Sequence, residues 1–439
     1  MRRAILLILL VVPSALLAQE PTSLPELWQR AQRVHPALQT QKAQKEVAEA
    51  QIGVARATGL PTLTGDANYA QGTGNHAPKP GTLPADIKDK NKLTDTTLFP
   101  YWTFQANAKY TVWDFGKVRA GVASAEHGAQ AADADLQTTR LAIWRDLVTV
   151  YAQALAAEAV LETARETLSQ AERHRDMAQK QMEARIRTEL DVLKTQTDVA
   201  TAQVDVLRAE DGVRSARVTL GLAVGDAQTP EGALQPPVLD AQGLTNLQGK
   251  EQLNALVLEA VKKRPEFRGI AERLLAQADT VRAVERTGWP SLYVTSNANT
   301  QGLDWGTLIY NYGFAAGISV PLQTLWLQPP AISAARAQER ALASQRDEQV
   351  LALRAELELA RTALLQARKR VPAVAAQLAL ALATRDAAEK RYAAGVAILI
   401  ELSDAEAALR SARIAQAQAE LDVTAATARM LADLGRAGR

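Results

Sequence analysis

The chain has 439 residues and no cysteine, and its 50 Lys and Arg nearly balance 48 Asp and Glu. The resulting net charge of +2 argues against a nucleic-acid-binding protein, which usually carries a clear basic excess. The lack of cysteine excludes a disulfide scaffold, thiolate metal ligands and a cysteine nucleophile. Hydrophobic residues make up 47% of the chain but aromatic ones only 5%, which favours long, closely packed helices.

Residues 1–18 have the layout of a secretory signal peptide. Arg2 and Arg3 precede a short apolar run that ends at Pro13, and small residues follow it. A membrane anchor is the alternative, although the run is short for a membrane span. We therefore expect an exported chain whose mature part begins near Gln19.

The rest of the chain is a duplication, and such repeats decide the fold. One set of residues recurs 229 positions later (256 − 27): Leu27, Ala31, Pro36, Gly59 and Pro61 match Leu256, Ala260, Pro265, Gly288 and Pro290. A heptad pattern recurs 210 positions later (402 − 192), so that Val192 and Val199 match Leu402 and Leu409. We expect a first repeat over 19–225, a linker over 226–250 and a second repeat over 251–439.

Each repeat should contain two strands after an opening helix, at about 61–71 and 99–113, and again at about 290–299 and 309–321. Apolar and polar residues alternate along the second strand of each pair. Alternating segments of about ten residues with aromatic ends fit transmembrane β-strands, and a half-buried soluble sheet is the alternative. The common parity predicts a lipid-facing set of Phe104, Ala106, Tyr110, Tyr312, Phe314 and Ile318.

Four strands cannot close a barrel by themselves, and an open sheet edge in lipid would leave backbone groups unpaired. The smallest membrane barrels have about eight strands, so copies of the chain must share one barrel. The arithmetic allows a dimer of eight strands or a trimer of twelve and does not choose between them.

Two long helical hairpins are expected at about 117–223 and 330–434. Residues 118–182 contain no proline, and a continuous helix of that length would span about 90 Å, three times a bilayer core. Such a hairpin must project into an aqueous compartment. The heptads predict that its helices pack along partner helices as a coiled coil.

These features together resemble the TolC family of outer-membrane channel proteins. Trp113-Asp114-Phe115-Gly116-Lys117 is similar to the family's strand-to-helix corner, with Asp114 and Gly116 as its marked positions. Arg391-Tyr392-Ala393-Ala394-Gly395, followed by 401–406, is similar to its hairpin turn around Gly395. Two departures stand out: the second corner, at 321–325, lacks Asp-x-Gly, and Arg185 replaces the turn glycine in the first hairpin.

The resemblance implies a mostly helical fold with a small β part, arranged as a homotrimer. Its twelve-stranded transmembrane barrel would continue into a periplasmic α-helical coiled-coil tunnel. It further implies contact with outer-membrane lipid and docking to a periplasmic adaptor (membrane fusion) protein and an inner-membrane transporter. The location would be the outer membrane of a Gram-negative bacterium, extending into the periplasm.

The resemblance also implies a gate at the periplasmic hairpin ends. Glu401 and Asp404 match the family's acidic positions, and their spacing of three places them on one helical face. Threefold symmetry would make each a ring of carboxylates that favours cations. Tyr392 matches a tyrosine that helps hold the ends together. Asp191, together with Arg185 or Arg187, is the corresponding candidate set in the first hairpin, and solvated turn charges are the alternative for all six residues.

The expected function is a passive outer-membrane exit duct of a tripartite efflux or type I secretion system. A periplasmic structural or adaptor coiled coil without a barrel is the alternative. We expect no enzyme activity, catalytic residue, cofactor or nucleic acid partner. The four histidines lack ligand spacing, so no metal site is expected either. The pattern does not distinguish drugs, metal ions and polypeptides as cargo.

Overall fold

The computed structural model describes residues 22–73, 98–185, 188–226, 232–239, 244, 250–306, 308–394 and 396–436. The expected signal peptide, residues 1–18, lies outside them. The described chain is mostly helical with one small antiparallel sheet, in agreement with the expected fold class. It forms two compact units: the first comprises the described parts of 1–41, 136–265 and 350–439, and the second those of 42–135 and 266–349.

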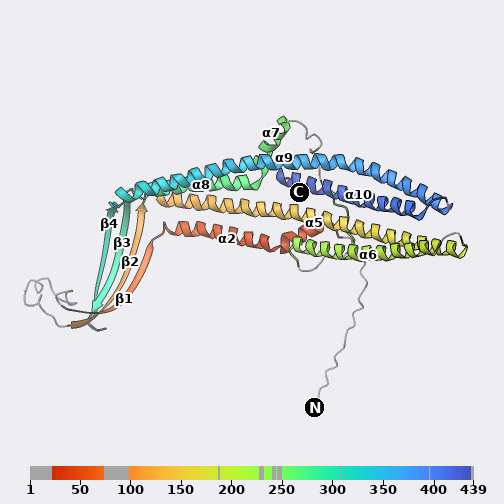
Figure 1. The fold of residues 1–439 in the computed structure, drawn as a ribbon. Helices are drawn as coiled ribbons and strands as arrows, with labels where there is room; N and C mark the ends of the chain where they lie inside the picture. The colour runs from red at the N-terminus through yellow and green to blue at the C-terminus, as the bar shows by residue number, and fades with distance from the viewer. Residues whose placement is uncertain are drawn as a thin grey trace, which may run out of the picture. The chain divides into compact units, whose positions relative to one another are not determined.

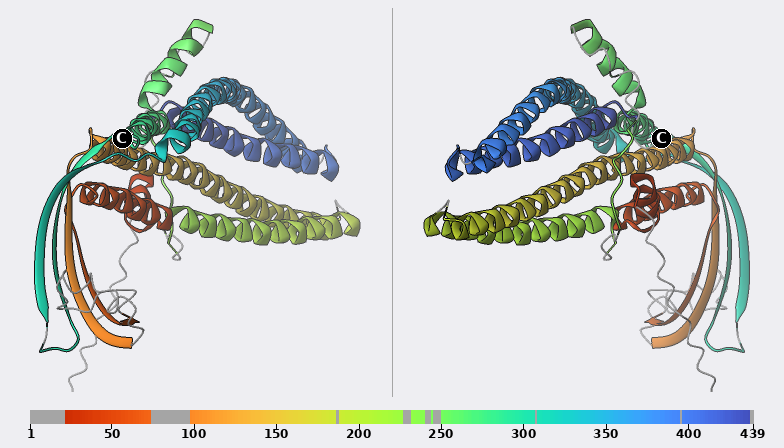
Figure 2. Two further views of the ribbon diagram at one scale, coloured as in Figure 1. Left: turned by 90° about the vertical axis from the view of Figure 1, so that its left-hand side faces the viewer. Right: turned by 90° about the vertical axis from the view of Figure 1, so that its right-hand side faces the viewer.

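The second unit contains one four-stranded sheet in the order β1-β2-β3-β4. The strands are β1 (Thr62–Thr73), β2 (Leu98–Trp113), β3 (Ser291–Gly302) and β4 (Ile309–Ser319), and all neighbours are antiparallel. The four strands lie side by side and curve together along their length (Figures 1 and 2). β1 and β4 form the two edges, so each has one partner strand within the described chain. Each repeat therefore contributes one strand pair to a single sheet.

The pairing register places the two repeats in phase. Phe104 of β2 lies opposite Thr300 of β3, and Ser296 of β3 lies opposite Phe314 of β4. Directly opposed residues of an antiparallel pair point to the same side of the sheet, and so do residues separated by two or four positions. Phe104 and Phe314 consequently share one face.

A tight corner joins β2 to helix α5 (Lys117–Glu183). The Asp114 carboxylate accepts the backbone N–H of Gly116 at 2.9 Å and that of Val118 at 2.7 Å. Phe115 and Gly116 both have positive φ, 55° and 81°, a conformation that glycine adopts without strain. The acidic cap thus pairs a donor of the first helical turn, which would otherwise have no acceptor.

The second corner, which lacks Asp-x-Gly, has a different hydrogen-bond pattern, without an acidic side chain that accepts from the first helical turn. Helix α9 (Thr324–Ala393) begins at Thr324, whose backbone N–H and side-chain hydroxyl both donate to the carbonyl of Pro321. α9 therefore begins six residues before the expected start of the second hairpin at about 330.

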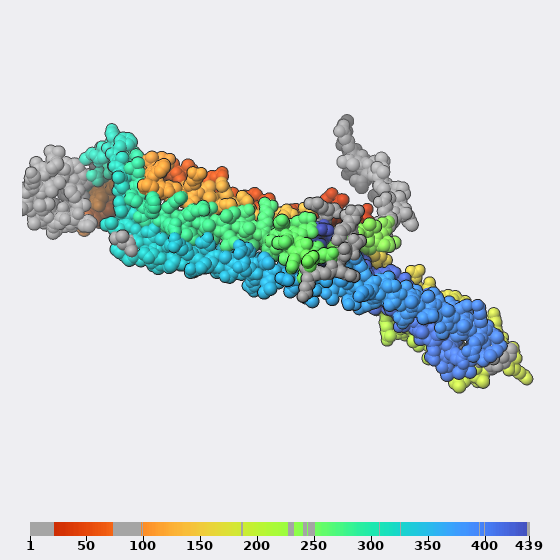
Figure 3. Space-filling model, turned by 90° about the horizontal axis from the view of Figure 1, so that it is seen from above, coloured from red at the N-terminus to blue at the C-terminus, as the bar shows by residue number. Residues whose placement is uncertain are grey.

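Four helical segments belong to the second unit together with the sheet. They are α8 (Pro265–Arg286), most of α2 (Pro36–Ala57) and the opening parts of α5 and α9. Figure 3 shows α8 lying along the first part of α9. Gln277 of α8 donates to the carbonyl of Ala335 at 3.0 Å. Gly288 follows α8, and a side chain there would require the amide end of Gln328 of α9 to move.

The first unit contains the second part of α5, from residue 136, and the second part of α9, from residue 350, together with the helices that follow them. α5 is followed by α6 (Glu189–Val224), and α9 by α10 (Leu399–Asp433). Residues of the predicted heptads form the buried seam, among them Val192, Val199, Ala202, Leu402, Ala405, Leu409 and Ala412. α5 also contains an 18-residue window apolar enough to cross a membrane by composition, of which 33% is buried in the structure. Glu158 of α5 forms an ion pair with Arg217 of α6 at 2.7 Å.

Tyr151 of α5 forms hydrogen bonds both to Thr22, which precedes the first helix, and to Gln235, which lies between the two repeats. Its hydroxyl lies 2.7 Å from the carbonyl oxygen of Gln235 and 3.0 Å from that of Thr22, and it accepts the N–H of Gln235. Burial raises the pKa of this phenol, which stays a neutral donor at ordinary pH. The same unit contains the short helices α1 (Leu24–Val34) and α7 (Lys250–Lys263).

Candidate functional site

The end of the second hairpin is built around Tyr392. This side chain is 1% exposed and belongs to a buried cluster with Ala388, Ala397, Leu402 and Ala405, against which Met177 of α5 packs. The tyrosine therefore belongs to a cluster that joins α9 to α10, and this cluster contacts the first hairpin through Met177. Its ring lies inside the hairpin rather than on its outer surface.

The two acidic candidates of this hairpin are exposed at the start of α10. Glu401 forms an ion pair with Arg391, the last basic residue of α9, at 3.2 Å. Both side chains are largely in solvent, so this contact contributes little to stability. Asp404 is also exposed, one helical turn further along. Both carboxylates are thus placed where a solute or a partner chain can reach them.

The first hairpin ends differently, although the repeat offset aligns Asp191 with Glu401. The Asp191 carboxylate accepts the backbone N–H and the hydroxyl of Thr188 at 3.2 and 3.0 Å, and its own N–H donates to that hydroxyl. This is a capping box at the start of α6. The aligned cap of α10 is Ile398, which has no side-chain acceptor. Asp191 is consequently engaged in capping, whereas Glu401 is left to pair with an arginine.

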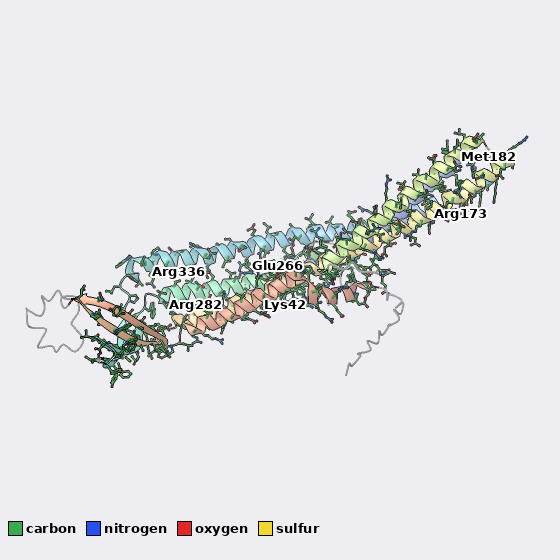
Figure 4. All side chains as sticks on the ribbon, turned by 90° about the horizontal axis from the view of Figure 1, so that it is seen from below. Lys42, Arg173, Met182, Glu266, Arg282 and Arg336 are labelled. Carbon is green, nitrogen blue, oxygen red and sulfur yellow. The ribbon has the colours of Figure 1, made fainter. Side chains whose placement is uncertain are left out.

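Arg185 lies just after α5, and its backbone N–H donates to the carbonyl of Met182 at 2.8 Å. Met182 marks this end of the first hairpin in Figure 4. Arg185 has a φ of 61°, the left-handed conformation that the aligned glycine would adopt more easily. Its side chain is exposed. Arg187 and Gly395, the remaining candidates of the two turns, lie outside the described residues.

A row of ionic contacts, which the sequence analysis missed, joins α10 to the first hairpin. Glu406, Arg410 and Arg413 follow each other at spacings of four and three and therefore line one helical face. Their partners are His174 of α5 at 2.6 Å, Asp205 of α6 at 3.3 Å and Glu166 of α5, respectively. The only sequence signal was the spacing on α10, because the partners lie more than 200 positions away.

A small polar cleft opens beside this row. His174, Thr195, Asp198, Ser403 and Glu406 line it. Burial, and secondarily the charge of Glu406, raise the pKa of the Asp198 carboxyl, while Lys194 and Arg410 oppose that shift. Among the described residues no group of His, Asp and Glu is arranged to hold a metal ion.

The sheet of the second unit has one apolar and one polar face. All six residues predicted to face lipid lie on the apolar face, namely Phe104, Ala106, Tyr110, Tyr312, Phe314 and Ile318. Tyr312 and Phe314 are 81% and 83% exposed in the single chain. Phe104 is less exposed because Trp305 packs against its ring at 5.4 Å between centroids. An isolated soluble protein would rarely leave such a face uncovered.

The opposite face carries amides and hydroxyls. Gln105 donates to Asn107 at 3.1 Å, and these two residues lie opposite Asn299 and Asn297 of β3. On β4, a Cβ at position 317 would come within 2.8 Å of the hydroxyl of Tyr293, so glycine leaves room for that ring. Lys109 lies over the same ring, 5.1 Å from its centroid. This face is polar and carries two residues of opposite charge, Lys109 and Asp66.

Comparison with known proteins agrees with this arrangement. The family model described as outer membrane efflux protein matches residues 27–226 and 256–436, one stretch in each repeat. A search of curated protein sequences gives no match.

Several solved structures share the fold at low sequence identity. The CmeC outer membrane channel of Campylobacter jejuni is 14% identical with a TM-score of 0.76, covering 95% of this chain and 87% of that one. The MtrE outer membrane channel of Neisseria gonorrhoeae is 21% identical with a TM-score of 0.74, covering 94% and 88%. The outer membrane protein VceC of Vibrio cholerae is 19% identical with a TM-score of 0.73, covering 94% and 96%.

Proposed function

The chain belongs to the outer membrane efflux protein family, and on this premise we propose that it is the passive exit duct of a tripartite efflux system or of a type I secretion system. The observation that carries the proposal is the sheet, with an exposed apolar face on one side and a polar face on the other. Such a sheet suits a barrel wall between lipid and a water-filled lumen.

We propose a homotrimer in which three sheets close one twelve-stranded barrel. β1 and β4 are edge strands, and edges cannot stay unpaired in hydrocarbon. β4 of one copy would pair with β1 of the next. The family supports three copies rather than two, since the strand count by itself allows either.

In this assembly Phe104, Tyr110, Tyr312, Phe314 and Ile318 face lipid, and the amides of Gln105, Asn107 and Asn297 face the lumen. A charged side chain on the lipid face would be destabilising, whereas the same change on the lumen face would meet water. No catalytic residue is needed for passive transport, and none is proposed.

We propose that the hairpin ends form the periplasmic gate. Glu401 and Asp404, each repeated three times around the axis, would be its acidic rings and would attract cations. Arg391 would partly neutralise the Glu401 ring, since the two are paired in the single chain. Tyr392 would act from within the hairpin by fixing α9 against α10. Asp191, Arg185 and Arg187 would shape the first hairpin's end.

The family also supports docking to a periplasmic adaptor and, through it, to an inner-membrane transporter. The alternative, a periplasmic coiled coil without a barrel, does not account for the exposed rings of β4. Residues 1–18 would direct export and be removed.

Fractionation of cells that produce the full chain tests this function. We expect the protein in the outer membrane, as an SDS-resistant oligomer that dissociates on heating. Recovery in the soluble periplasmic fraction as a monomer would refute the duct and favour the coiled-coil alternative. A Phe314→Arg variant is the matched control, because it should lose the heat-modifiable oligomer without a change in the helical part.

A further inference from the structure

Two oppositely charged side chains lie on the polar face of the sheet. Asp66 of β1 and Lys109 of β2 are the only residues of the four described strands that carry a formal charge. In the register of these two strands, Asp66 lies opposite Gln105 and Lys109 lies opposite Thr62. Lys109 has the same parity as Gln105 and Asn107, whose amides belong to the polar face. Both charges therefore point away from the apolar face.

The two charges are too far apart to form an ion pair with each other. Four residues separate their positions along the strands, which corresponds to about 13 Å at about 3.4 Å per residue. Both side chains are exposed. The row that contains Asp66 continues across the sheet through Gln105, Asn299 and Asn311, which are uncharged amides. Each charge consequently dominates its own level of the sheet.

Tyr293 of β3 gives the ammonium group of Lys109 a defined position. The Nζ atom of Lys109 lies 5.1 Å from the centroid of the Tyr293 ring, within the range of a cation–π interaction. Tyr293 lies opposite Thr111 on one side and Gly317 on the other, so its ring also belongs to the polar face. The lysine charge is thus held against the sheet at one level.

The two charges lie at different distances from the helices. β2 continues through the Asp114 corner into α5, and Lys109 lies four residues before the end of this strand at Trp113. Asp66 lies opposite Gln105, four residues further from that end. With the strand tilt of about 40° that is usual in membrane barrels, the two levels are about 10 Å apart along the barrel axis. A solute that leaves the helical tunnel would meet the lysine level first.

We propose that Asp66 and Lys109, each repeated three times around the axis, form two oppositely charged rings that act as a second ion filter inside the barrel. This inference rests on the proposed trimeric duct. The lysine ring attracts anions and repels cations, and the aspartate ring does the reverse. A solute with one net charge therefore meets a repulsive level whichever sign it carries, whereas neutral and zwitterionic solutes meet no net barrier. The filter is distinct from the proposed acidic rings at the hairpin ends, which have one sign.

The size of the effect follows from Coulomb's law in water. For an ion on the axis, about 10 Å from three like charges, the local concentration changes about fivefold at 0.01 M salt and about twofold at 0.15 M. The difference arises because the Debye length falls from about 30 Å to about 8 Å. Selectivity that comes from the rings should therefore increase as the salt is diluted.

Recordings from the full-length protein in planar lipid bilayers test the rings through neutral variants. Near 0.01 M salt, Asp66→Asn should lower the cation-to-anion permeability ratio by at least about twofold, and Lys109→Gln should raise it by at least about twofold. The double variant should return close to the wild-type ratio, because the two losses oppose each other. At 1 M salt, where the Debye length is about 3 Å, all four proteins should have the same ratio.

Chemical restoration of the charge separates its effect from a structural one. The chain contains no cysteine, so Asp66→Cys and Lys109→Cys each introduce a single thiol. An anionic methanethiosulfonate should restore the wild-type ratio in Asp66→Cys, and a cationic one should do so in Lys109→Cys. Ala67→Cys and Ala108→Cys are matched controls, because these neighbouring positions point to the apolar face. Charged reagents should leave their thiols unreacted and their currents unchanged.

The filter and the duct can fail separately. If the wild type gives no current, the duct fails and the filter fails with it. If the wild type conducts but Asp66→Asn and Lys109→Gln keep its permeability ratio near 0.01 M salt, the filter is refuted and the duct stands. Equal labelling of thiols at positions 66, 67, 108 and 109 in the conducting protein would also refute the filter, because the two charges would then not be confined to the lumen.

Discussion

Oδ2 of Asp114 accepts the backbone N–H of Val118 at 2.7 Å, so the carboxylate that ends a strand also caps the helix that follows it. The same carboxylate binds Gly116 through Oδ1, and the guanidinium of Arg286 donates to the Gly116 carbonyl at 2.8 Å. Residues from both repeats therefore fix the point where the sheet meets the helices. The Asp-x-Gly sequence is explained by capping and by the positive φ of its glycine.

Removing this cap should destabilise the protein measurably. Asp114→Ala leaves the N–H of Val118 without its acceptor, at a cost of about 1–2 kcal/mol. Asp114→Asn keeps an acceptor oxygen and should lose less. Denaturant unfolding in detergent, followed by circular dichroism, checks the order wild type, Asn, Ala. Equal midpoints for all three proteins would show that the cap is unimportant.

Asp433, near the end of α10, should give stability a distinct pH dependence. Its side chain is buried, and burial raises the pKa of this carboxyl, although nearby Arg264 opposes the shift. A raised pKa in the folded state means that the stabilising contribution of the neutral form is complete at low pH. It is lost as the pH rises through the folded-state pKa. Asp433→Asn should therefore be more stable than the wild type at pH 7, and the difference should vanish near the acid limit.

Asp386 of α9 is a matched control with the opposite sign. A hydrogen bond from Lys390 lowers the pKa of this exposed carboxyl, so its small contribution is present at neutral pH and lost on acidification. Asp386→Asn should leave stability at pH 7 unchanged or slightly reduced. An increase for Asp386→Asn equal to that for Asp433→Asn would contradict the role of burial. Unfolding midpoints measured from pH 3 to pH 8 supply the comparison.

The assignment of the sheet faces predicts opposite outcomes at two adjacent positions. Phe314→Arg places a charge in lipid and should cost about 2–4 kcal/mol, enough to impair membrane assembly. Ala315→Arg places the same charge on the polar face and should be tolerated. Yields of heat-modifiable oligomer in the outer membrane measure both. Equal yields would mean that the face assignment is wrong.

The acidic residues at the second hairpin should set ion selectivity. The double variant Glu401→Ala/Asp404→Ala removes six carboxylates from a trimer and should shift the reversal potential toward the nonselective value. Block by trivalent cations should weaken by at least about tenfold, because clustered like charges bind such ions. Asp191→Ala is the comparison: its carboxylate caps α6, so it should lower stability more than selectivity. An unchanged reversal potential in the double variant would place the selectivity elsewhere.

The fold class could be predicted from the sequence because the spacing of hydrophobic residues along the chain distinguishes helices from strands. Hydrophobic spacing changes from 3.6 to 2 at residues that the structure places in β2 and β4, and the repeat offset pairs the two halves. Parity alone was enough to group Phe104 with Phe314. Their common face depends only on register, and antiparallel register is strongly specified when one face must be apolar.

The contacts between hairpins could not be predicted in this way. His174 meets Glu406, and Arg413 meets Glu166, across more than 200 positions of sequence. The spacing of hydrophobic residues within one helix does not identify such partners, because they depend on how the two hairpins pack against each other. The capping box at Asp191 was also missed, although Thr188 three positions before it was a readable signal. The repeat offset aligns Asp191 with Glu401 and so predicts a shared charge, whereas its hydrogen bonds depend on the local sequence around Thr188.

The central claim, that this chain forms a transmembrane duct, is tested most directly by single-channel recording. Purified full-length protein is added to planar lipid bilayers under a fixed voltage, with Phe314→Arg prepared in parallel as the assembly-defective control. The account predicts discrete, uniform current steps for the wild type that carry more cation than anion, and none for Phe314→Arg. A wild-type oligomer that inserts into the outer membrane but produces no current steps would contradict it.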